Sequence, residues 1–165
     1  MPTITLPCGR ALLLDEPDFV AFGHLRWTAA RSAQRDERYY AHARDPERKA
    51  NVYIHRLILS PPPSLLVDHV NGDGLDNRRA NIRVATRSQN NANSNIFNPL
   101  GYRGVCLVPS GRFKATISDR ERAQKSRYIG TFDTPGEAAR AYDAAAIERF
   151  GEFARLNFPL QRRAA

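Results

Sequence analysis

Residues 55–91 read HRLILSPPPSLLVDHVNGDGLDNRRANIRVATRSQNN, and the order of short runs in this stretch decides the fold that we predict. Leu65–His69 is an apolar run that ends in two polar residues, which predicts a strand. A turn rich in glycine and asparagine follows, and Asn81–Thr86 predicts a second strand. From about Ser88 the polar sequence predicts a helix, so the stretch as a whole predicts two strands followed by a helix.

Four polar residues in this stretch have a spacing that the predicted elements bring together. Asp68 and His69 end the first strand, Asn81 begins the second, and Asn90 lies early in the helix. A lone Asp-His pair is weak evidence for a site and by itself favours a strand end that carries two hydrogen-bonding groups. The spacing of the two asparagines favours a site, because a hairpin followed by a helix would gather all four side chains.

The last third of the chain predicts a second unit. Arg112–Ser118 alternates strictly: Phe113 and every second residue after it are apolar, whereas Lys114 and its alternates are basic or polar. Strands are also predicted at Tyr102–Val108 and Ser126–Phe132. Thr134-Pro135-Gly136-Glu137 is a capping box that opens a helix ending at Gly151. We therefore predict a three-stranded antiparallel sheet covered by one helix, with an open cationic face.

The first 50 residues predict a β-rich segment. Residues 3–14 indicate a hairpin, 17–27 a short helix, and 39–41 a strand. Residues 52–59 predict either a buried strand or a short helix, which Pro61 and the prolines after it would end. The predicted fold class is thus α+β throughout.

Charge is concentrated in one part of the chain. The 165 residues carry 25 Lys+Arg and 17 Asp+Glu, a net charge of +8, and 22 of the cations are arginine. Residues 99–127 hold seven cations and two anions, whereas 128–165 is neutral. A localised basic segment is typical of a nucleic-acid binder. The arginine content by itself is equally explained by genome base composition.

Composition excludes several classes of protein. No apolar run approaches the ~20 residues that a membrane span requires. The N-terminus lacks the basic and long apolar segments of a secretory signal. Two cysteines, Cys8 and Cys106, exclude a framework of several disulfides and a four-cysteine zinc ribbon. We expect a reducing, cytoplasmic location.

The stretch 55–91 resembles the HNH endonucleases, in the phage-type subgroup that has asparagine where other members have histidine. The resemblance is carried by the following motifs: His55-Arg56-Leu57, Asp68-His69, the Gly/Asn turn, Asp76-Asn77-Arg78, Asn81-Ile82-Arg83 and Thr86-Arg87-Ser88-Gln89-Asn90. It implies a ββα-metal fold and a DNA endonuclease. Residues 1–50 are similar to the β-rich lead-in of this subgroup.

The resemblance also implies a role for each matched residue. His69 would be the general base, since its ordinary pKa near 6.5 lets it accept a proton from water. Asn81 would hold the imidazole through its other nitrogen. Asp68 and Asn90 would bind one Mg²⁺ or Mn²⁺. His55 would serve either packing and hydrogen bonding or catalysis, and Asn77 would organise the loop.

Residues 102–159 resemble the DNA-binding domain of the plant ethylene-response factors, the Apetala-type domain. The matching motifs are Tyr102-Arg103-Gly104-Val105, Gly111-Arg112-Phe113-Lys114-Ala115, Tyr128-Ile129-Gly130-Thr131-Phe132-Asp133-Thr134, Glu137-Ala138-Ala139-Arg140-Ala141-Tyr142-Asp143 and Leu156-Asn157-Phe158-Pro159. The resemblance implies a sheet that lies in the major groove of double-stranded DNA, backed by the helix.

We predict five DNA-binding residues in this domain: Arg103, Arg112, Lys114, Arg127 and Tyr128. Arg103 matches a base-reading arginine of the family, and Tyr128 replaces a tryptophan. Several arginines of the plant domains are absent, for example at Cys106 and Ser118, so the plant target sequence does not transfer. Arg112 and Lys114 are expected to contact phosphates, which position a protein without specifying sequence.

Together these interpretations predict a monomeric, site-specific, metal-dependent DNA endonuclease of the homing or mobile-element type, which nicks one strand. Its nuclease domain would span 1–97, with a lead-in at 1–50 and a core at 51–97, and its DNA-binding domain 98–160, before a tail at 161–165. No protein partner is predicted. One alternative is a DNA-binding transcriptional regulator with an inactive nuclease module. Another is an RNA-binding or ribosome-associated basic protein.

Overall fold

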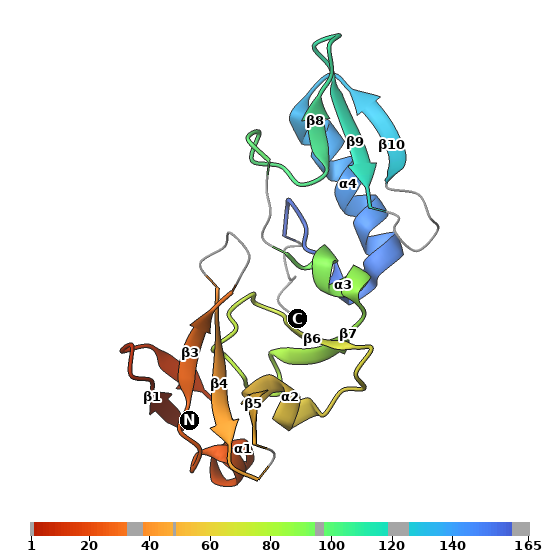
Figure 1. The fold of residues 1–165 in the computed structure, drawn as a ribbon. Coiled ribbons are helices and arrows are strands. Elements are labelled where there is room, and N and C mark those ends of the chain that lie inside the picture. Colours follow the sequence, from red (N-terminus) through yellow and green to blue (C-terminus); the bar gives the residue numbers. More distant parts are fainter. Residues whose placement is uncertain (1, 33–37, 48, 95–97, 119–125, 160–165) are drawn as a thin grey trace, which may run out of the picture. The chain divides into compact units, whose positions relative to one another are not determined.

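The structure is a computed structural model that describes residues 2–32, 38–47, 49–94, 98–118 and 126–159 (Figure 1). The basic loop residues Arg120, Arg122 and Lys125, the predicted tail and part of the predicted linker lie outside these ranges. The chain forms two compact units, Met1–Arg87 and Ser88–Ala165. Every sheet pairs its strands antiparallel, which agrees with the predicted α+β class.

The first unit contains two hairpins, a three-stranded sheet and two short helices. In chain order its elements are β1 (Thr3–Thr5), β2 (Ala11–Leu13), α1 (Glu16–Phe22), β3 (Thr28–Arg31), β4 (Tyr39–Asp45), β5 (Ala50–Tyr53), α2 (Ile54–Leu59), β6 (Leu66–His69) and β7 (Ile82–Ala85). The strands pair as β1-β2, β3-β4-β5 and β6-β7. The hairpins predicted at 3–14 and 65–86 are therefore confirmed.

Residues 52–59, for which the sequence leaves strand and helix open, contain both. Strand β5 ends at Tyr53, whose extended backbone (φ −98°, ψ 135°) caps helix α2. The helix ends at Ser60, one residue before the first proline, in a left-handed conformation. The change occurs because Val52 lies in the sheet whereas Ile54 and Ile58, four residues apart, are both buried from one helical face.

One hydrophobic core joins the N-terminal elements to the β6-β7 hairpin. Its buried members are Leu6, Leu12, Leu14, Trp27, Ala41, Ala43, Ile54, Ile58, Leu75 and Ile82. The edge of β2 also bonds directly to the loop between β6 and β7: Leu13 N–H donates to the carbonyl of Leu75, and Leu13 accepts from Asn77 N–H, both at 2.9 Å. The β-rich lead-in therefore supports the loop that follows Asp68 and His69.

The second unit is a three-stranded sheet backed by a long helix. Its elements are α3 (Arg87–Ala92, which begins at the unit boundary), β8 (Val105–Leu107), β9 (Phe113–Ile117), β10 (Arg127–Phe132), α4 (Pro135–Phe150) and the 3-10 turn η2 (Gly151–Phe153). The strand order is β10-β9-β8, and α4 packs along one face of this sheet (Figure 1). The sheet-and-helix arrangement predicted for the last third is confirmed.

Local sequence explains both the sheet and the helix of this unit. Ala115 and Ile117 of β9 are fully buried against α4, as the strict alternation predicts. The capping box of α4 forms as predicted, with reciprocal bonds between Thr134 and Glu137. Strand β8 is shorter than predicted because Gly104 has a positive φ of +71°, and a Cβ there would meet the ring of Tyr142.

None of the helices in the described ranges is long and apolar enough to span a membrane. Packing divides the chain after Arg87, the first residue of α3, whereas the sequence predicts a domain boundary at residues 97/98. That boundary stays a prediction.

Candidate active site and nucleic-acid interface

Asp68 and His69 are the last two residues of β6, as predicted. The hairpin register pairs Asp68 with Arg83 and His69 with Ile82 of β7. Both side chains are buried, with 4% and 5% of their surface exposed. A histidine in this position sits on rigid backbone rather than in a loop, which suits a group that must hold one orientation.

Asn77 is the residue that contacts the imidazole of His69. Its Oδ1 lies 3.2 Å from Nε2 of His69, and its Nδ2 donates to the carbonyl of Gly74, also at 3.2 Å. Because Oδ1 only accepts, Nε2 carries the proton, and Nδ1 is then the basic nitrogen of the ring. Asn77 is fully buried, and its backbone is tied to Leu13 of β2.

The family resemblance assigns this imidazole to Asn81, and that role stays a prediction. The amide of Asn81 is used inside the loop: Oδ1 accepts from Asn71 N–H at 3.0 Å, and Nδ2 donates to Asn71 Oδ1 and to the carbonyl of Asp76. Asn81 organises the turn, whereas Asn77, expected only to organise it, also orients His69. The physical reason is that the backbone of Asn77 is bonded to Leu13 of β2, which holds Asn77 in the core, whereas the side chain of Asn81 bonds to Asn71.

Aromatic rings surround the buried side of His69. The His55 ring lies edge-on to the His69 ring with centroids 5.3 Å apart, Tyr40 lies 5.8 Å from both, and Tyr53 stacks on His55 at 5.5 Å. Nδ1 of His55 is buried without a hydrogen-bond partner. These contacts are those of a packing residue. A catalytic role for His55 stays a prediction.

Burial controls the protonation of both histidines. Loss of water lowers the pKa of His55 to about 3, with the nearby His69 and Arg56 acting in the same direction. Burial also lowers the pKa of His69, against the opposing effects of the Asn77 bond and of Asp68. Near neutral pH, His69 is therefore uncharged and able to accept a proton, as a general base requires.

Asp68 forms a buried ion pair with Arg83. Oδ2 of Asp68 accepts from Nε of Arg83 at 2.9 Å and from Nη2 at 2.8 Å. A carboxylate in this position fits a hard cation, which takes one or two carboxylates and completes its shell with water and phosphate oxygens. Such an ion would share the carboxylate with Arg83.

Further metal ligands are limited in number. No group of three His, Cys, Asp or Glu side chains that could hold a metal occurs within the part of the chain described. Asn90, the second predicted ligand, lies on α3 and belongs to the second unit. A shared site formed by Asp68 and Asn90 stays a prediction.

Two ion pairs that the sequence does not single out brace the loop between β6 and β7. Arg79 forms a two-pronged pair with the buried Asp18 of α1, at 2.9 and 2.8 Å. Arg78 binds Asp76, and this bond holds the pKa of that carboxyl below its ordinary value. Asp18 and Arg79 are 61 residues apart. No local pattern predicts their contact.

The open face of the second unit's sheet carries polar and basic side chains. Lys114 of β9 lies opposite Cys106 of β8 and Thr131 of β10. Tyr128 is 60% exposed, and its hydroxyl bonds to that of Thr131 at 2.9 Å. Lys114 and Tyr128 thus occupy the face opposite α4, where a DNA contact is expected.

The other three predicted DNA-binding residues have partners within the second unit. Arg127 pairs with Ile117 in the register, so it is on the helix side, where it lies 3.8 Å from Glu148 of α4. Arg112 precedes β9 and binds Asp133 at 2.8 Å at the edge of the sheet.

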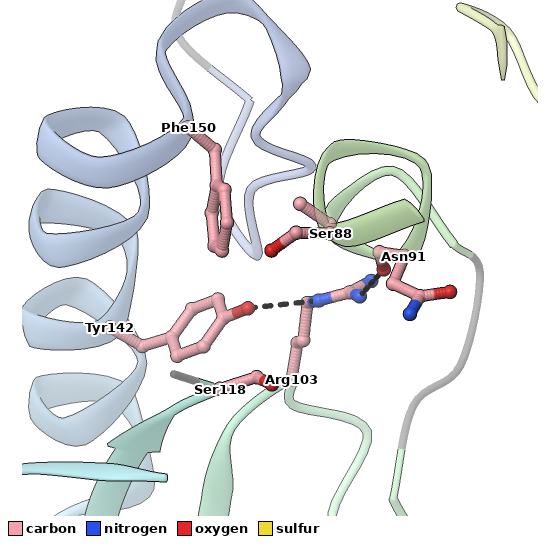
Figure 2. Close-up of a pocket in the computed structure, with 7 residues that line it drawn as sticks. Ser88, Asn91, Arg103, Ser118, Tyr142 and Phe150 are labelled. Atoms are coloured by element: carbon pink, nitrogen blue, oxygen red, sulfur yellow. Dashed lines mark hydrogen bonds between the residues drawn. The ribbon is translucent and has the colours of Figure 1, made fainter. Parts of the chain in front are cut away.

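Arg103 points away from the open face altogether. Its guanidinium bonds to the hydroxyl of Tyr142 on α4 and to the chain at the end of α3 (Figure 2). The backbone explains this direction, because Asn157 binds both the N–H and the carbonyl of Arg103. The prediction that Arg103 binds DNA stays a prediction.

Comparison with known proteins identifies the class of each region. Residues 60–92 match the family model of HNH endonucleases, and residues 100–152 match that of the AP2 domain. Both resemblances drawn from the sequence are confirmed. The chain thus joins a segment of a nuclease family to a domain that indicates DNA binding.

The individual relatives fall into the same two groups. An uncharacterized HNH endonuclease of Acanthamoeba polyphaga mimivirus is 31% identical over 107 residues, which are 64% of this chain and 54% of the relative. Ethylene-responsive transcription factor 3 of Nicotiana tabacum is 52% identical over 60 residues, 36% of this chain and 26% of the relative. The chain thus spans about a quarter to about half the length of these relatives.

Proposed function

We propose that this protein is a site-specific, metal-dependent DNA endonuclease of the homing or mobile-element type. The observation that carries the proposal is the buried pair Asp68-His69, with His69 held by Asn77, inside the segment that matches the HNH family. An AP2 domain follows on the same chain, which supports DNA as the substrate. We propose a monomer whose nuclease domain spans 1–97 and whose DNA-binding domain spans 98–160.

In the proposed reaction each residue has a separate task. Nδ1 of His69 takes the proton from the attacking water, while Asn77 keeps Nε2–H turned inward and so fixes the tautomer. Asp68, with Asn90 as predicted, would hold one Mg²⁺ or Mn²⁺. The bound metal supplies charge stabilisation to the scissile phosphate and its leaving oxygen. One such site per monomer cuts one strand at a time, so nicks are the expected product.

A plasmid assay tests the proposal. Supercoiled DNA that includes the sequence flanking the gene is incubated with protein and Mg²⁺ or Mn²⁺. The relaxed form should accumulate, and EDTA should stop it. His69→Ala should abolish cleavage and retain DNA binding, whereas His24→Ala, at an exposed histidine of the same unit, should cut normally. Cleavage that survives His69→Ala contradicts the assigned base.

The ion pair between Asp68 and Arg83 supports one alternative, a DNA-binding regulator whose nuclease module is inactive. In that case Arg83 occupies the carboxylate permanently and no metal binds. Firm DNA binding with no nick under any divalent metal would favour this function. A competition assay with RNA separates both functions from an RNA-binding protein.

A further inference from the structure

Three rings of the first unit contact one another around the proposed general base. Tyr40 lies in β4, His55 in α2 and His69 in β6. The ring centroid of Tyr40 lies 5.8 Å from that of each histidine, and the two histidine centroids are 5.3 Å apart. His55 meets both other rings edge-on, which is a preferred arrangement of aromatic pairs. The rings of Tyr40 and His55 thus limit the space in which the imidazole of His69 can turn.

Two small residues leave the space that the Tyr40 ring occupies. Ala30 of β3 is the register partner of Tyr40. Gly74, in the loop between β6 and β7, lies so close to β4 that a Cβ there would be 2.5 Å from Cδ1 of Tyr40 and closer still to the carbonyl oxygen of Tyr39. A side chain at position 74 would therefore force the loop away from β4, and only glycine permits this approach.

Gly74 also connects Tyr40 to the residue that orients His69. The carbonyl of Gly74 accepts from Nδ2 of Asn77 at 3.2 Å, and Oδ1 of Asn77 lies 3.2 Å from Nε2 of His69. The contacts therefore run from Tyr40 to Gly74, Asn77 and His69, and from His69 back to Tyr40. We call these four residues the Tyr40 cluster. All of them belong to the first unit.

The ring of Tyr40 protects the bond between Asn77 and His69. In a close-packed interior, a side chain keeps one orientation because its neighbours fill the space around it. Removal of the ring would open a gap beside the imidazole, and a gap next to polar groups admits water. Water there would compete with Oδ1 of Asn77 for the proton on Nε2 of His69, so the second tautomer would become populated.

We propose that Tyr40 is a positioning residue of the nuclease site: its ring holds the imidazole of His69 in the orientation in which Asn77 fixes the tautomer. The inference rests on the proposed function, in which His69 is the general base. Tyr40 acts through His69 and contacts no reacting atom in this scheme. The proposal gives strand β4 of the N-terminal lead-in a specific role beside the site.

The test compares Tyr40→Leu with Tyr40→Phe in the full chain. Leucine removes the ring, whereas phenylalanine keeps it and removes only the hydroxyl. ¹⁵N NMR of histidine-labelled protein measures the tautomer of His69 at a pH at which the ring is neutral, and the spectrum of His69→Ala assigns the signal. Tyr40→Leu should lower the ratio of the Nε2–H to the Nδ1–H tautomer about tenfold. Tyr40→Phe should keep the wild-type ratio.

Nicking rates over a range of DNA concentrations give the second measurement. Tyr40→Leu should lower kcat about tenfold and leave KM within about twofold, because the DNA contacts are unchanged. Tyr40→Phe should restore kcat. If Tyr40→Leu only lowers the free energy of unfolding and keeps the tautomer ratio and kcat, Tyr40 has a purely structural role, and the inference is overturned. A Tyr40→Phe variant as impaired as Tyr40→Leu also overturns it, since the hydroxyl would then be the group required.

Gly74→Ala tests the same cluster from the loop. The added Cβ must displace either the ring of Tyr40 or the backbone of β4, so the tautomer ratio should fall as it does in Tyr40→Leu. Gly136→Ala is the control, because a Cβ at that helical position makes only an ordinary contact with Arg140 at 3.6 Å. A tautomer ratio that stays at the wild-type value in both Gly74→Ala and Tyr40→Leu contradicts the inference.

The NMR measurement separates this inference from the proposed function. If the wild type nicks DNA, but Tyr40→Leu keeps the normal tautomer and kcat, the inference fails alone. If the wild type cuts with no divalent metal, the nuclease proposal fails, while a changed tautomer ratio in Tyr40→Leu still supports the positioning of His69 by Tyr40.

Discussion

At the scale of single residues, Asn77 is the side chain on which the orientation of His69 depends. Asn77→Ala should lower kcat by about 10- to 100-fold, because the imidazole loses the acceptor that fixes its tautomer. The substitution also leaves the buried carbonyl of Gly74 without its donor, which should destabilise the protein by about 1–3 kcal/mol. Single-turnover cleavage measures the first effect, and urea unfolding the second.

Asn77→Asp is the matched control, because a carboxylate keeps the acceptor for Nε2–H, although it loses the donor to Gly74 and adds a buried negative charge beside His69. It should retain more cleavage than Asn77→Ala. Asn81→Ala should destabilise the turn, since both atoms of its amide bond within it. If Asn81→Ala changed the tautomer of His69 instead, Asn81 would have the role that the family resemblance implies, which is to hold that imidazole.

His55 makes stability depend on pH. Burial lowers its pKa in the folded protein to about 3, against about 6.5 in the unfolded chain, so below pH 6.5 the unfolded state binds the extra proton. The contribution to the free energy of unfolding is thus fully present above pH 6.5 and is lost as the pH falls toward 3. The loss should approach at most about 1.4 kcal/mol per pH unit.

Urea unfolding of His55→Gln at pH 7, 6, 5 and 4 checks this prediction. The variant should be less stable at pH 7, because it loses ring packing against Tyr40 and Tyr53. Its stability should also fall less steeply with acid than that of the wild type. His24→Gln, at an exposed position, serves as the control. Equal slopes for His55→Gln and the wild type would mean that His55 is protonated in the folded protein.

At the scale of elements, the sequence predicts structure wherever the deciding contacts are local. The alternation of Phe113, Ala115 and Ile117 assigns the buried face of β9, and the capping box begins α4 at the expected residue. The alternation of side chains along a strand also applies to β10. Successive residues of a strand face opposite sides, so Arg127 and Tyr128 cannot share the open face.

The site depends on contacts that span tens of residues, and there the sequence is a poor guide. The choice between Asn77 and Asn81 is made by the bonds between β2 and the β6-β7 loop, which join Leu13 to Asn77. The direction of Arg103 is set by Asn157, 54 residues later. Motif spacing gives the position of such residues in the chain, but not their partners.

The two faces of the second unit's sheet should differ in their effect on DNA binding. Lys114→Ala should weaken binding and lower the slope of log K against log salt by about 0.9, the contribution of one phosphate contact. Arg127→Ala removes the same charge from the helix side and should leave the slope unchanged, because it lies near Glu148. Anisotropy titrations between about 50 and 200 mM salt provide the data.

Arg112→Ala gives an intermediate case, since Arg112 is bound to Asp133 at the edge of the sheet and must leave that partner to reach a phosphate. The double change Arg112→Ala plus Lys114→Ala should flatten the slope more than Lys114→Ala alone. An Arg127→Ala slope as low as that of Lys114→Ala would mean that DNA contacts the helix side instead.

At the scale of the whole molecule, the proposed general base and the proposed DNA-binding face lie in different units. Within the first, the N-terminal lead-in braces the loop that carries Asn77, through the Leu13 bonds and the pair between Asp18 and Arg79. This gives residues 1–50 a structural role beside the proposed nuclease site. Within the second, residues 99–127 carry a net charge of +5 in the sequence and include Lys114. In the proposed function, cutting and holding DNA would therefore depend on different sets of residues.

This division predicts that defects in the two units combine independently. Lys114→Ala should raise KM and leave kcat at saturating DNA within about twofold, whereas Asn77→Ala should lower kcat and leave KM nearly unchanged. The variant with both changes should show the product of the two losses in kcat/KM, because side chains without shared partners contribute additively to the free energy. Steady-state nicking rates over a range of DNA concentrations measure all four proteins. A loss in kcat/KM much smaller than this product would mean that Lys114 and Asn77 act on the same step. DNA held by the sheet would then also be oriented at His69.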